Sequence, residues 1–228
     1  MEMKLSTRIC LGFIFFLLAA CGSKTESSQE LLLVEQFRSI FNKSEVGGQV
    51  NPRKVITRSM IDASNVPLIL IEVLNGDQIA TLSAFPGSTL NEVWLSADGR
   101  TVTTQNGMLI ATRGMNYDLM GADVGAASYS LEKTITGKRE AHHLRLYKYL
   151  AADNQDKIIE YSCVFSKESQ ETIFIFEKPY KTLRMSEDCE SGGLQFKNTY
   201  WVEKNGMIRK SQQWHGHNIG LILIERVI

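Results

Sequence analysis

No stretch of this sequence is apolar for long enough to cross a membrane as a helix. The longest run, residues 11–20, has ten residues, whereas a spanning helix needs roughly 20. An excess of charge of either sign is also missing, because 25 basic and 25 acidic residues cancel. Binding to nucleic acid requires clustered Lys and Arg, so the composition gives no support to that class of function.

Motifs of common catalytic sites are missing too. The chain has no Gly-x-Ser-x-Gly elbow, phosphate-binding loop, His-Glu-x-x-His zinc motif or dinucleotide fingerprint. Two facing carboxylates, as glycosidases use, could be assembled from Glu92, Asp118, Asp123 or Glu203, but any chain with 25 acidic residues offers such sets. We therefore expect no enzymatic activity, with a polysaccharide-modifying enzyme as the alternative.

The four histidines form two close pairs and predict no metal site or other cofactor. His215 and His217, two residues apart, would lie on one face of a strand, at a spacing that allows a shared metal. Adjacent His142 and His143 would point to opposite faces, so only one of them could join such a site. We expect exposed histidines in turns and strands.

Proline is scarce, with four in the chain, and no Pro/Gly/Ser-rich linker divides the sequence after residue 30. The 43% hydrophobic and 22% charged residues are typical of a globular protein and exclude disorder or a polytopic membrane protein. A chain of 228 residues corresponds to one domain or two small ones. We expect one domain over residues 31–228.

The N-terminal segment has the order of features of a lipoprotein signal. Lys4 and Arg8 precede the apolar run, which ends in Leu18-Ala19-Ala20-Cys21 and resembles the bacterial lipobox. We predict a signal peptide over residues 1–20, acylation of Cys21 through diacylglycerol and palmitate, and a polar tether over residues 21–30. Two acyl chains give stable membrane anchoring. The alternative is an ordinary cleaved signal with an incidental cysteine.

Two cysteines remain for the folded part of the chain. Cys163 and Cys189 form an even pair in an exported protein, which favours a disulfide. Two free buried thiols are the alternative, and neither cysteine lies in a nucleophile motif.

Turn signals divide the chain after residue 60 into short apolar or β-branched runs. Asn75-Gly76, Asp98-Gly99, Asn106-Gly107 and Asn205-Gly206 favour type I′ hairpin turns. They predict hairpin strands at residues 66–74, 78–85, 92–97, 100–105, 108–113, 199–204 and 207–214. Further strands are expected at residues 144–150, 157–165, 172–176 and 221–228, with turns at residues 151–156 and 167–170.

Residues 31–43 carry apolar side chains at helical spacing and predict a short amphipathic helix. About a dozen short strands with one helix indicate an all-β fold. The expected fold class is an antiparallel β-barrel or barrel-like sandwich with one short N-terminal helix.

Several aromatic residues lie in or beside these hairpins and are candidate contacts for a glycan or a partner protein. Sugars stack on aromatic rings, and Arg pairs with acidic sugar carboxylates. Alternation along the strand puts Tyr200 and Trp201 on opposite faces, so one of the two is expected to be exposed. The candidates are Trp94, Tyr200, Trp201, Arg209 and Trp214.

Two segments resemble the YjbF/GfcB family of group 4 capsule and exopolysaccharide lipoproteins. They are residues 94–114, with the turn Thr112-Arg113-Gly114, and residues 198–214, in which a Tyr-Trp-Val strand leads to an Ile-Arg-x-Ser-x-Gln strand. The resemblance covers residues 60–228, and Cys163, Cys189 and Cys21 fit the family's two-cysteine spacing and lipidation site.

The resemblance implies an outer-membrane lipoprotein with a β-barrel-like domain in the periplasm. Gly22 in place of Asp after Cys21 agrees with transfer to the outer membrane. The implied partners are polysaccharide export proteins, namely a porin-like outer-membrane protein and a small periplasmic protein, and the polysaccharide itself. We expect an accessory of capsule or exopolysaccharide production or export. The alternative is a lipid or glycolipid carrier with a hollow barrel.

Overall fold

The structure is a computed structural model that describes residues 51–228 apart from residues 65, 77, 88–90, 138–140 and 152–154. The expected signal peptide, the acylation site Cys21, the tether and the helix over residues 31–43 lie outside the described residues, so they stay predictions.

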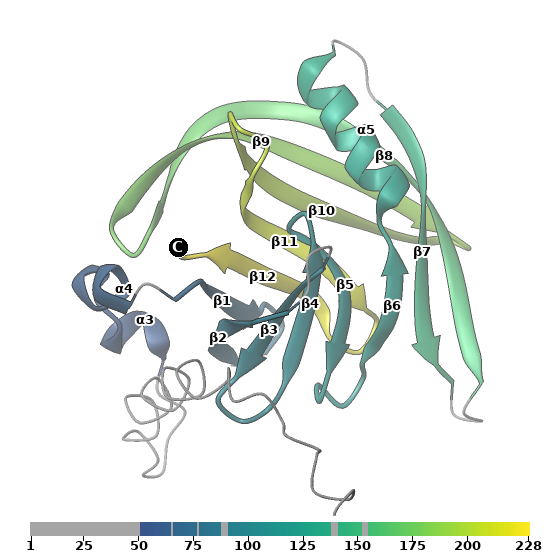
Figure 1. The fold of residues 1–228 in the computed structure, drawn as a ribbon. Helices are drawn as coiled ribbons and strands as arrows, with labels where there is room; N and C mark the ends of the chain where they lie inside the picture. Colours follow the sequence, from purple (N-terminus) through teal and green to yellow (C-terminus); the bar gives the residue numbers. More distant parts are fainter. Residues whose placement is uncertain (1–50, 65, 77, 88–90, 138–140, 152–154) are drawn as a thin grey trace, which may run out of the picture. The chain divides into compact units, whose positions relative to one another are not determined.

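Twelve antiparallel strands form one sheet that curls into a nearly closed barrel (Figure 1). This confirms the expected fold class. The strand order is β5-β4-β3-β2-β1-β12-β11-β10-β9-β8-β7-β6. The strands are β1 (Leu68–Val73), β2 (Ile79–Phe85), β3 (Glu92–Ser96), β4 (Thr101–Gln105), β5 (Met108–Arg113), β6 (Leu119–Asp123), β7 (Ala141–Leu150), β8 (Asp156–Ile175), β9 (Lys178–Ser191), β10 (Leu194–Glu203), β11 (Ile208–Gly216) and β12 (Gly220–Arg226).

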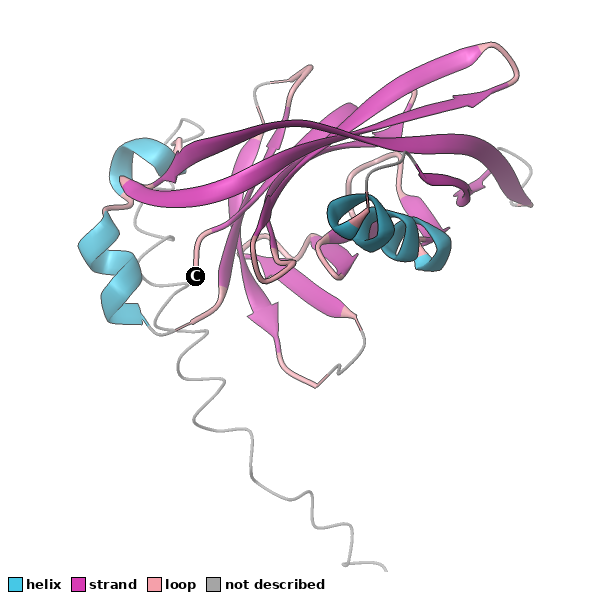
Figure 2. Ribbon diagram, turned by 90° about the horizontal axis from the view of Figure 1, so that it is seen from above, coloured by secondary structure: helices cyan, strands magenta, loops and turns pink. Residues whose placement is uncertain are grey.

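The described residues also contain the helices α3 (Pro52–Val55), α4 (Arg58–Ser64) and α5 (Gly125–Thr136). None of the three was expected. Figure 2 shows α5 within the curve of the sheet, while α3 and α4 lie at the other end. Within this part of the chain, no helix combines the length and the apolar character needed to cross a membrane.

The hairpin turns confirm the predicted strand pairing but not the predicted turn type. Of the four turns predicted as type I′, Asn106-Gly107 alone has positive φ at both central residues, 51° and 78°, as this turn type requires. At the turns of Gly99 and Gly206 only the glycine has positive φ. The β8–β9 turn also has positive φ at two successive residues, Phe176 and Glu177. Neither is Asn, Asp or Gly, so the sequence does not predict a turn there.

The expected turn at residues 167–170 is wrong, because these residues lie inside the 20-residue strand β8. The run is polar and exposed, yet it pairs with β9 across a bulge between Lys167 and Ser169. A strand with polar residues on both faces lacks the alternation of apolar and polar residues that predicts a strand, so its sequence predicts a loop. Strands β6 and β9 were likewise not expected.

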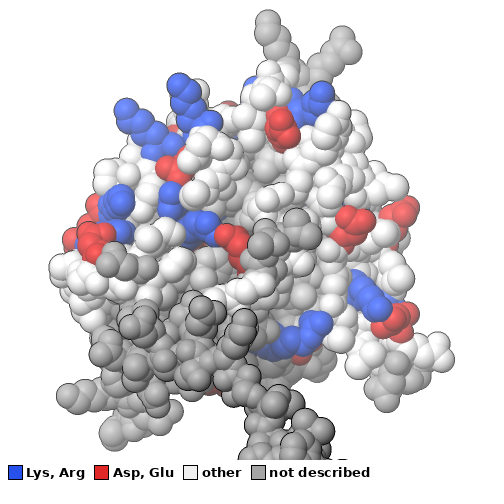
Figure 3. Space-filling model, viewed as in Figure 1, with Lys and Arg blue, Asp and Glu red and all other residues white. Residues whose placement is uncertain are grey.

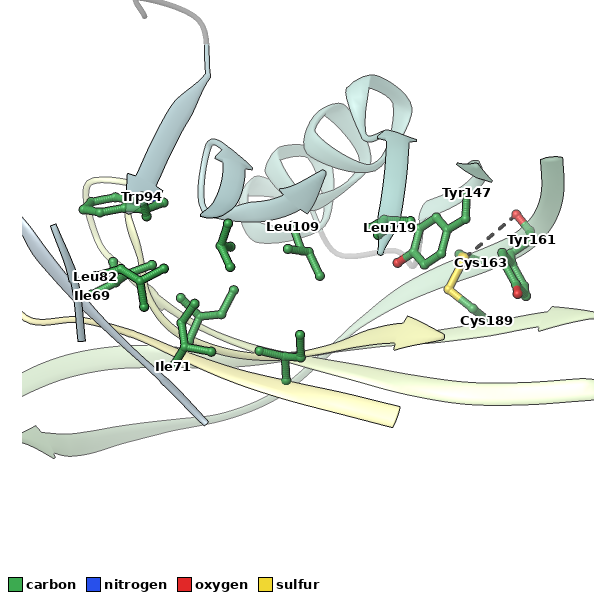
Figure 4. Packing of buried hydrophobic residues seen from close by; sticks show 13 residues of the cluster. Ile69, Ile71, Leu82, Trp94, Leu109, Leu119, Tyr147, Tyr161, Cys163 and Cys189 are labelled. Atoms are coloured by element: carbon green, nitrogen blue, oxygen red, sulfur yellow. Dashed lines mark hydrogen bonds between the residues drawn. A yellow bond between two sulfur atoms is a disulfide. The ribbon is translucent and has the colours of Figure 1, made fainter. Parts of the chain in front are cut away.

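Two apolar clusters fill the concave side of the sheet. The larger one includes Trp94, Leu109 and Tyr147 and the disulfide between Cys163 and Cys189 (Figure 4). These cysteines face each other on β8 and β9, so the predicted disulfide is confirmed. The smaller cluster packs α5 onto the sheet; its buried members are Met108, Val124, Ala127, Leu131, Phe165, Met185, Tyr200, Val202 and Ile208.

Side chains, rather than a backbone ladder, join β5 to β6 at the two ends of the strand order. The hydroxyl of Thr112 accepts a hydrogen bond from the Leu119 amide at 3.0 Å. Arg113 donates to the carbonyls of Leu119 and Met120 at 3.1 and 3.2 Å. Gly114, with φ +85°, turns the chain between the two strands. The Thr112-Arg113-Gly114 motif therefore closes the barrel.

Candidate functional site

Helix α5 forms one wall of the candidate site. Its buried residues Ala127, Ser130, Leu131 and Thr134 recur at helical spacing and face the smaller apolar cluster. The helix ends at Gly137, whose amide donates to the Lys133 carbonyl, and a Cβ there would meet that oxygen at 2.7 Å. Sequence reasoning missed this helix because small and polar residues make up most of its buried stripe.

A groove of about 910 Å³ opens along α5, between the helix and two hairpin turns. Its apolar base includes Met108, Leu131 and Ile208, and the Tyr129 side chain, 62% exposed, lies at its surface. Polar groups complete the lining: Glu92, Asn106, Ser128, Glu132, Thr136, Lys204, Asn205 and Arg226. The volume lies within the roughly 300–1,000 Å³ of typical ligand sites.

A second hollow of about 550 Å³ continues the groove past the end of α5. The two hollows share Ile135 and Lys204 in their linings, so they meet at these residues. The second hollow is further lined by residues of β8, β9 and β10, among them Gln170, Thr172 and Lys181. We call the two parts the tyrosine lobe and the lysine lobe of the groove.

A closed cluster of charged groups lies in the barrel interior, around the fully buried carboxylate of Glu187. It accepts hydrogen bonds from Arg145 Nη1 at 2.8 Å, Asn198 Nδ2 at 2.7 Å and the Tyr200 hydroxyl at 2.8 Å, and His143 Nε2 lies 2.7 Å away. Burial raises the pKa of Glu187, but Arg145 and the hydrogen bonds outweigh it and lower the pKa to about 2. Arg145 and the hydrogen bonds therefore keep Glu187 ionised although it is buried.

Glu187 also lies within 4.8 Å of His143 and Cys163, a set that contains metal-ligating residue types. Cys163 is in a disulfide and has no thiolate to offer, and Glu187 is already occupied by Arg145. This triad does not fit a metal ion.

The two histidines expected to share a strand face do not do so, because β11 ends at Gly216 and His217 lies in the turn before β12. His215 is buried, and its Nε2 lies 2.9 Å from the Thr112 hydroxyl. Burial lowers the pKa of His215 to about 4, against a smaller opposing effect of Asp118. His217 is exposed against the edge of Trp214. His215 therefore supports the seam between β5 and β6.

The candidate contact residues prove to be mostly buried. Trp94, Tyr200 and Trp201 are 2%, 0% and 7% exposed, so the expectation that Tyr200 or Trp201 is exposed is wrong. The Trp94 indole donates to Thr104 and that of Trp201 to Glu171.

Arg209 and Trp214 are partly exposed. Arg209 is committed to Glu203, and the Trp214 ring stacks on Phe196 at 5.3 Å. No candidate contact residue lines the tyrosine lobe or the lysine lobe. Tyr129, Lys181 and Lys204 were missed because nothing in the sequence marks them.

The four acidic residues considered for catalysis each have a structural partner. Glu92 pairs with Arg226, and Glu203 pairs with Arg209. The carboxylate of Asp118 accepts from the amides of Gly114 and Met115, and that of Asp123 accepts from the Gly125 amide at the start of α5. These contacts commit the four carboxylates to the fold.

Residues 34–227 match the family model described as group 4 capsule polysaccharide lipoprotein gfcB, YjbF. The chain belongs to this family. The resemblance carried by residues 94–114 and 198–214 is thereby confirmed, and the family's description agrees with an accessory role in capsule production.

The hypothetical lipoprotein YmcC of Escherichia coli K12 has a similar structure, with a TM-score of 0.70 and 20% sequence identity. The match covers 86% of this chain and 95% of that one, and at this identity it shows the fold. No curated protein matches the chain. This chain and the lipoprotein YmcC thus have the same fold.

Proposed function

We propose that this chain is a lipid-anchored accessory protein of capsule or exopolysaccharide production or export, and that it acts by binding rather than by catalysis. The observation that carries the proposal is the groove along α5, whose tyrosine lobe of about 910 Å³ is large, open and mixed in polarity. Membership of a capsule polysaccharide lipoprotein family supports the pathway.

Acylated Cys21 would anchor the chain, with Gly22 directing it to the outer membrane and the barrel facing the periplasm. The family's description as a lipoprotein supports the anchor. In this position the groove meets polysaccharide on its way to the surface, together with a porin-like outer-membrane protein and a small periplasmic partner.

The filled interior favours this proposal over a lipid carrier. In the described residues, two apolar clusters and the Glu187 cluster occupy the concave side of the sheet. The large hollow lies beside α5 and is lined by charged groups and amides, which suit a polar ligand better than an acyl chain.

The proposal is tested by complementing a gene deletion and measuring surface and periplasmic polysaccharide. Met207→Arg introduces a long charged side chain at the rim of the tyrosine lobe, where Met207 is 36% exposed. We expect loss of surface polysaccharide with retention in the periplasm.

Met60→Arg is the matched control, because Met60 is 42% exposed on α4 and does not line the groove. Cys21→Ala should release the protein from washed membranes. Unchanged polysaccharide in both compartments after deletion of the gene would contradict the proposal.

A further inference from the structure

Lys181 and Lys204 both line the lysine lobe, whose lining also includes Glu171 and Glu203. The ladder between β9 and β10 ends at the pair Thr182–Glu203. Lys181 precedes Thr182 on β9, and Lys204 follows Glu203 in the turn after β10, so the two lysines lie near each other at the end of the ladder. Both lysine side chains are exposed, and neither forms an ion pair with another described residue.

The two glutamates in the lining of this lobe have partners of their own. Side chains alternate along a strand, so Glu203 projects from the face opposite to Val202, which belongs to the cluster under α5. Glu203 binds Arg209, and Glu171 accepts from the Trp201 indole. Among the described residues that line the lobe, Lys181 and Lys204 are therefore the charged groups without a hydrogen-bond or ion-pair partner.

Figure 3 shows acidic and basic side chains interspersed over one face of the molecule. Two neighbouring ammonium groups without a partner in one hollow indicate a place for an anion. Exposed lysines bind carboxylates and phosphates through charge-assisted hydrogen bonds.

The rest of the groove has the side chains that recognise sugars. The 62% exposed Tyr129 ring offers a flat apolar surface for a pyranose, and Lys133 lies 5.3 Å from the ring centroid. The groove is also lined by amides and hydroxyls that can exchange hydrogen bonds with sugar hydroxyls: Asn106, Ser128, Thr136, Asn205, and, in the lysine lobe, Gln170 and Thr172. The carboxylate of Glu132 adds an acceptor.

We infer that the groove binds a saccharide segment that carries anionic groups, with an anionic group at Lys181 and Lys204 and a sugar ring at Tyr129. This inference rests on the proposed function and names its ligand class. The segment runs past Ile135, where the two lobes meet, and the combined hollow accommodates several sugar units. Carboxylates of uronic acids and phosphate substituents present the same chemistry to the lysines.

The test is calorimetric titration of the full chain, extracted from membranes in detergent, with two probes of equal length. The probes are a galacturonic acid tetramer and a neutral galactose tetramer. We expect the acidic tetramer to bind about tenfold more tightly at low salt, and the preference to shrink in 0.5 M NaCl because exposed charges are screened. A galactose tetramer with phosphate substituents distinguishes carboxylate from phosphate as the preferred anionic group.

Lys181→Gln with Lys204→Gln should abolish the preference for the acidic tetramer. Lys54→Gln with Lys157→Gln removes the same charge at exposed positions outside the groove and should retain it. Tyr129→Ala should weaken both tetramers alike, whereas Tyr117→Ala, at a 58% exposed tyrosine outside the lining, should weaken neither.

Equal binding of both tetramers, or a preference that survives loss of both groove lysines, overturns the inference and leaves the proposed function standing. Binding of neither tetramer, with export still lost in Met207→Arg, also overturns it and indicates a protein in the groove. Normal export in Met207→Arg contradicts the groove as the site of the proposed function, whatever the titrations show.

Discussion

The barrel interior and the groove along α5 both contain charged side chains, but they differ in how those charges are satisfied. Around Glu187 the hydrogen bonds come from Arg145, Asn198 and Tyr200, and the group is closed to solvent. In the groove, Lys181 and Lys204 have no ion-pair partner among the described residues, since Glu203 in the same lobe binds Arg209 and Glu171 accepts from Trp201. Buried groups with strongly shifted pKa values, such as Glu187, therefore stabilise the fold of this protein, whereas the exposed lysines without a partner are the groups available to a ligand.

The strongest way to test the structural role of the interior is to remove Arg145. Arg145→Met leaves the Glu187 carboxylate buried without its cation, and we expect the free energy of unfolding to fall by about 3–5 kcal/mol. Urea denaturation measures the change. The double variant Arg145→Met with Glu187→Gln should recover part of the loss, because no buried charge remains. A double variant less stable than the single one would contradict this account.

The disulfide in the same interior has the next largest expected effect. Cys163→Ala with Cys189→Ala frees two residues separated by 26 positions, and the chain-entropy model gives a loss of roughly 3 kcal/mol. Reduction of the unmodified protein with dithiothreitol is the control and should lower the urea midpoint to the same extent. A midpoint that does not respond to reduction would show that the interior is rigid without the bond.

His215 makes the barrel interior sensitive to pH. Its pKa in the folded state is about 4, below the ordinary 6.5, so the unfolded chain binds the proton more readily between these values. Stability from neutral His215 is complete above pH 6.5 and is lost as the pH falls to 4, a difference on the order of 3 kcal/mol. His215→Gln should flatten the stability profile in this window. The exposed His217→Gln should leave the profile as it is.

The groove lysines have the smallest expected effect on stability, and its sign is opposite. Lys181→Gln removes one of two neighbouring exposed lysine charges at the end of the β9–β10 ladder, so the free energy of unfolding should rise by roughly 0.2–1 kcal/mol at low salt. The increase should vanish at high salt, where exposed charges are screened. Differential scanning calorimetry at two salt concentrations measures it, with Lys157→Gln as control. A destabilised Lys181→Gln would show that this lysine has a structural partner.

Much of the fold could be predicted from local sequence signals. The Asn106-Gly107 turn and its alternating flanks define the β4–β5 hairpin, since this dipeptide adopts positive φ at both positions. The turn of β8–β9 could not be found, because Phe176 and Glu177 adopt the same conformation without residue types that favour it. Residues 167–170 inside β8 are predicted as a turn because they pair with β9, a strand that the alternation of apolar and polar residues does not predict.

The site was less predictable than the fold. Aromatic residues in the recognised hairpins drew attention, yet Trp94 and Trp201 are buried by tertiary packing that no local pattern encodes. Lys181 and Lys204 are 23 positions apart and meet only through the register of β9 and β10. The proximity of these two lysines therefore depends on long-range strand pairing.

The position of β12 in the sheet has a consequence for how the protein reaches this state. Ile71 of β1 pairs with Ile224 of β12, which lies 153 residues further along the chain (224 − 71). Pairs so distant in sequence form slowly, because the intervening loop must close before they contribute. Until residues 220–226 arrive, β1 presents an open apolar edge, a template for pairing with another chain. Nascent molecules of this protein therefore need shielding from one another during synthesis.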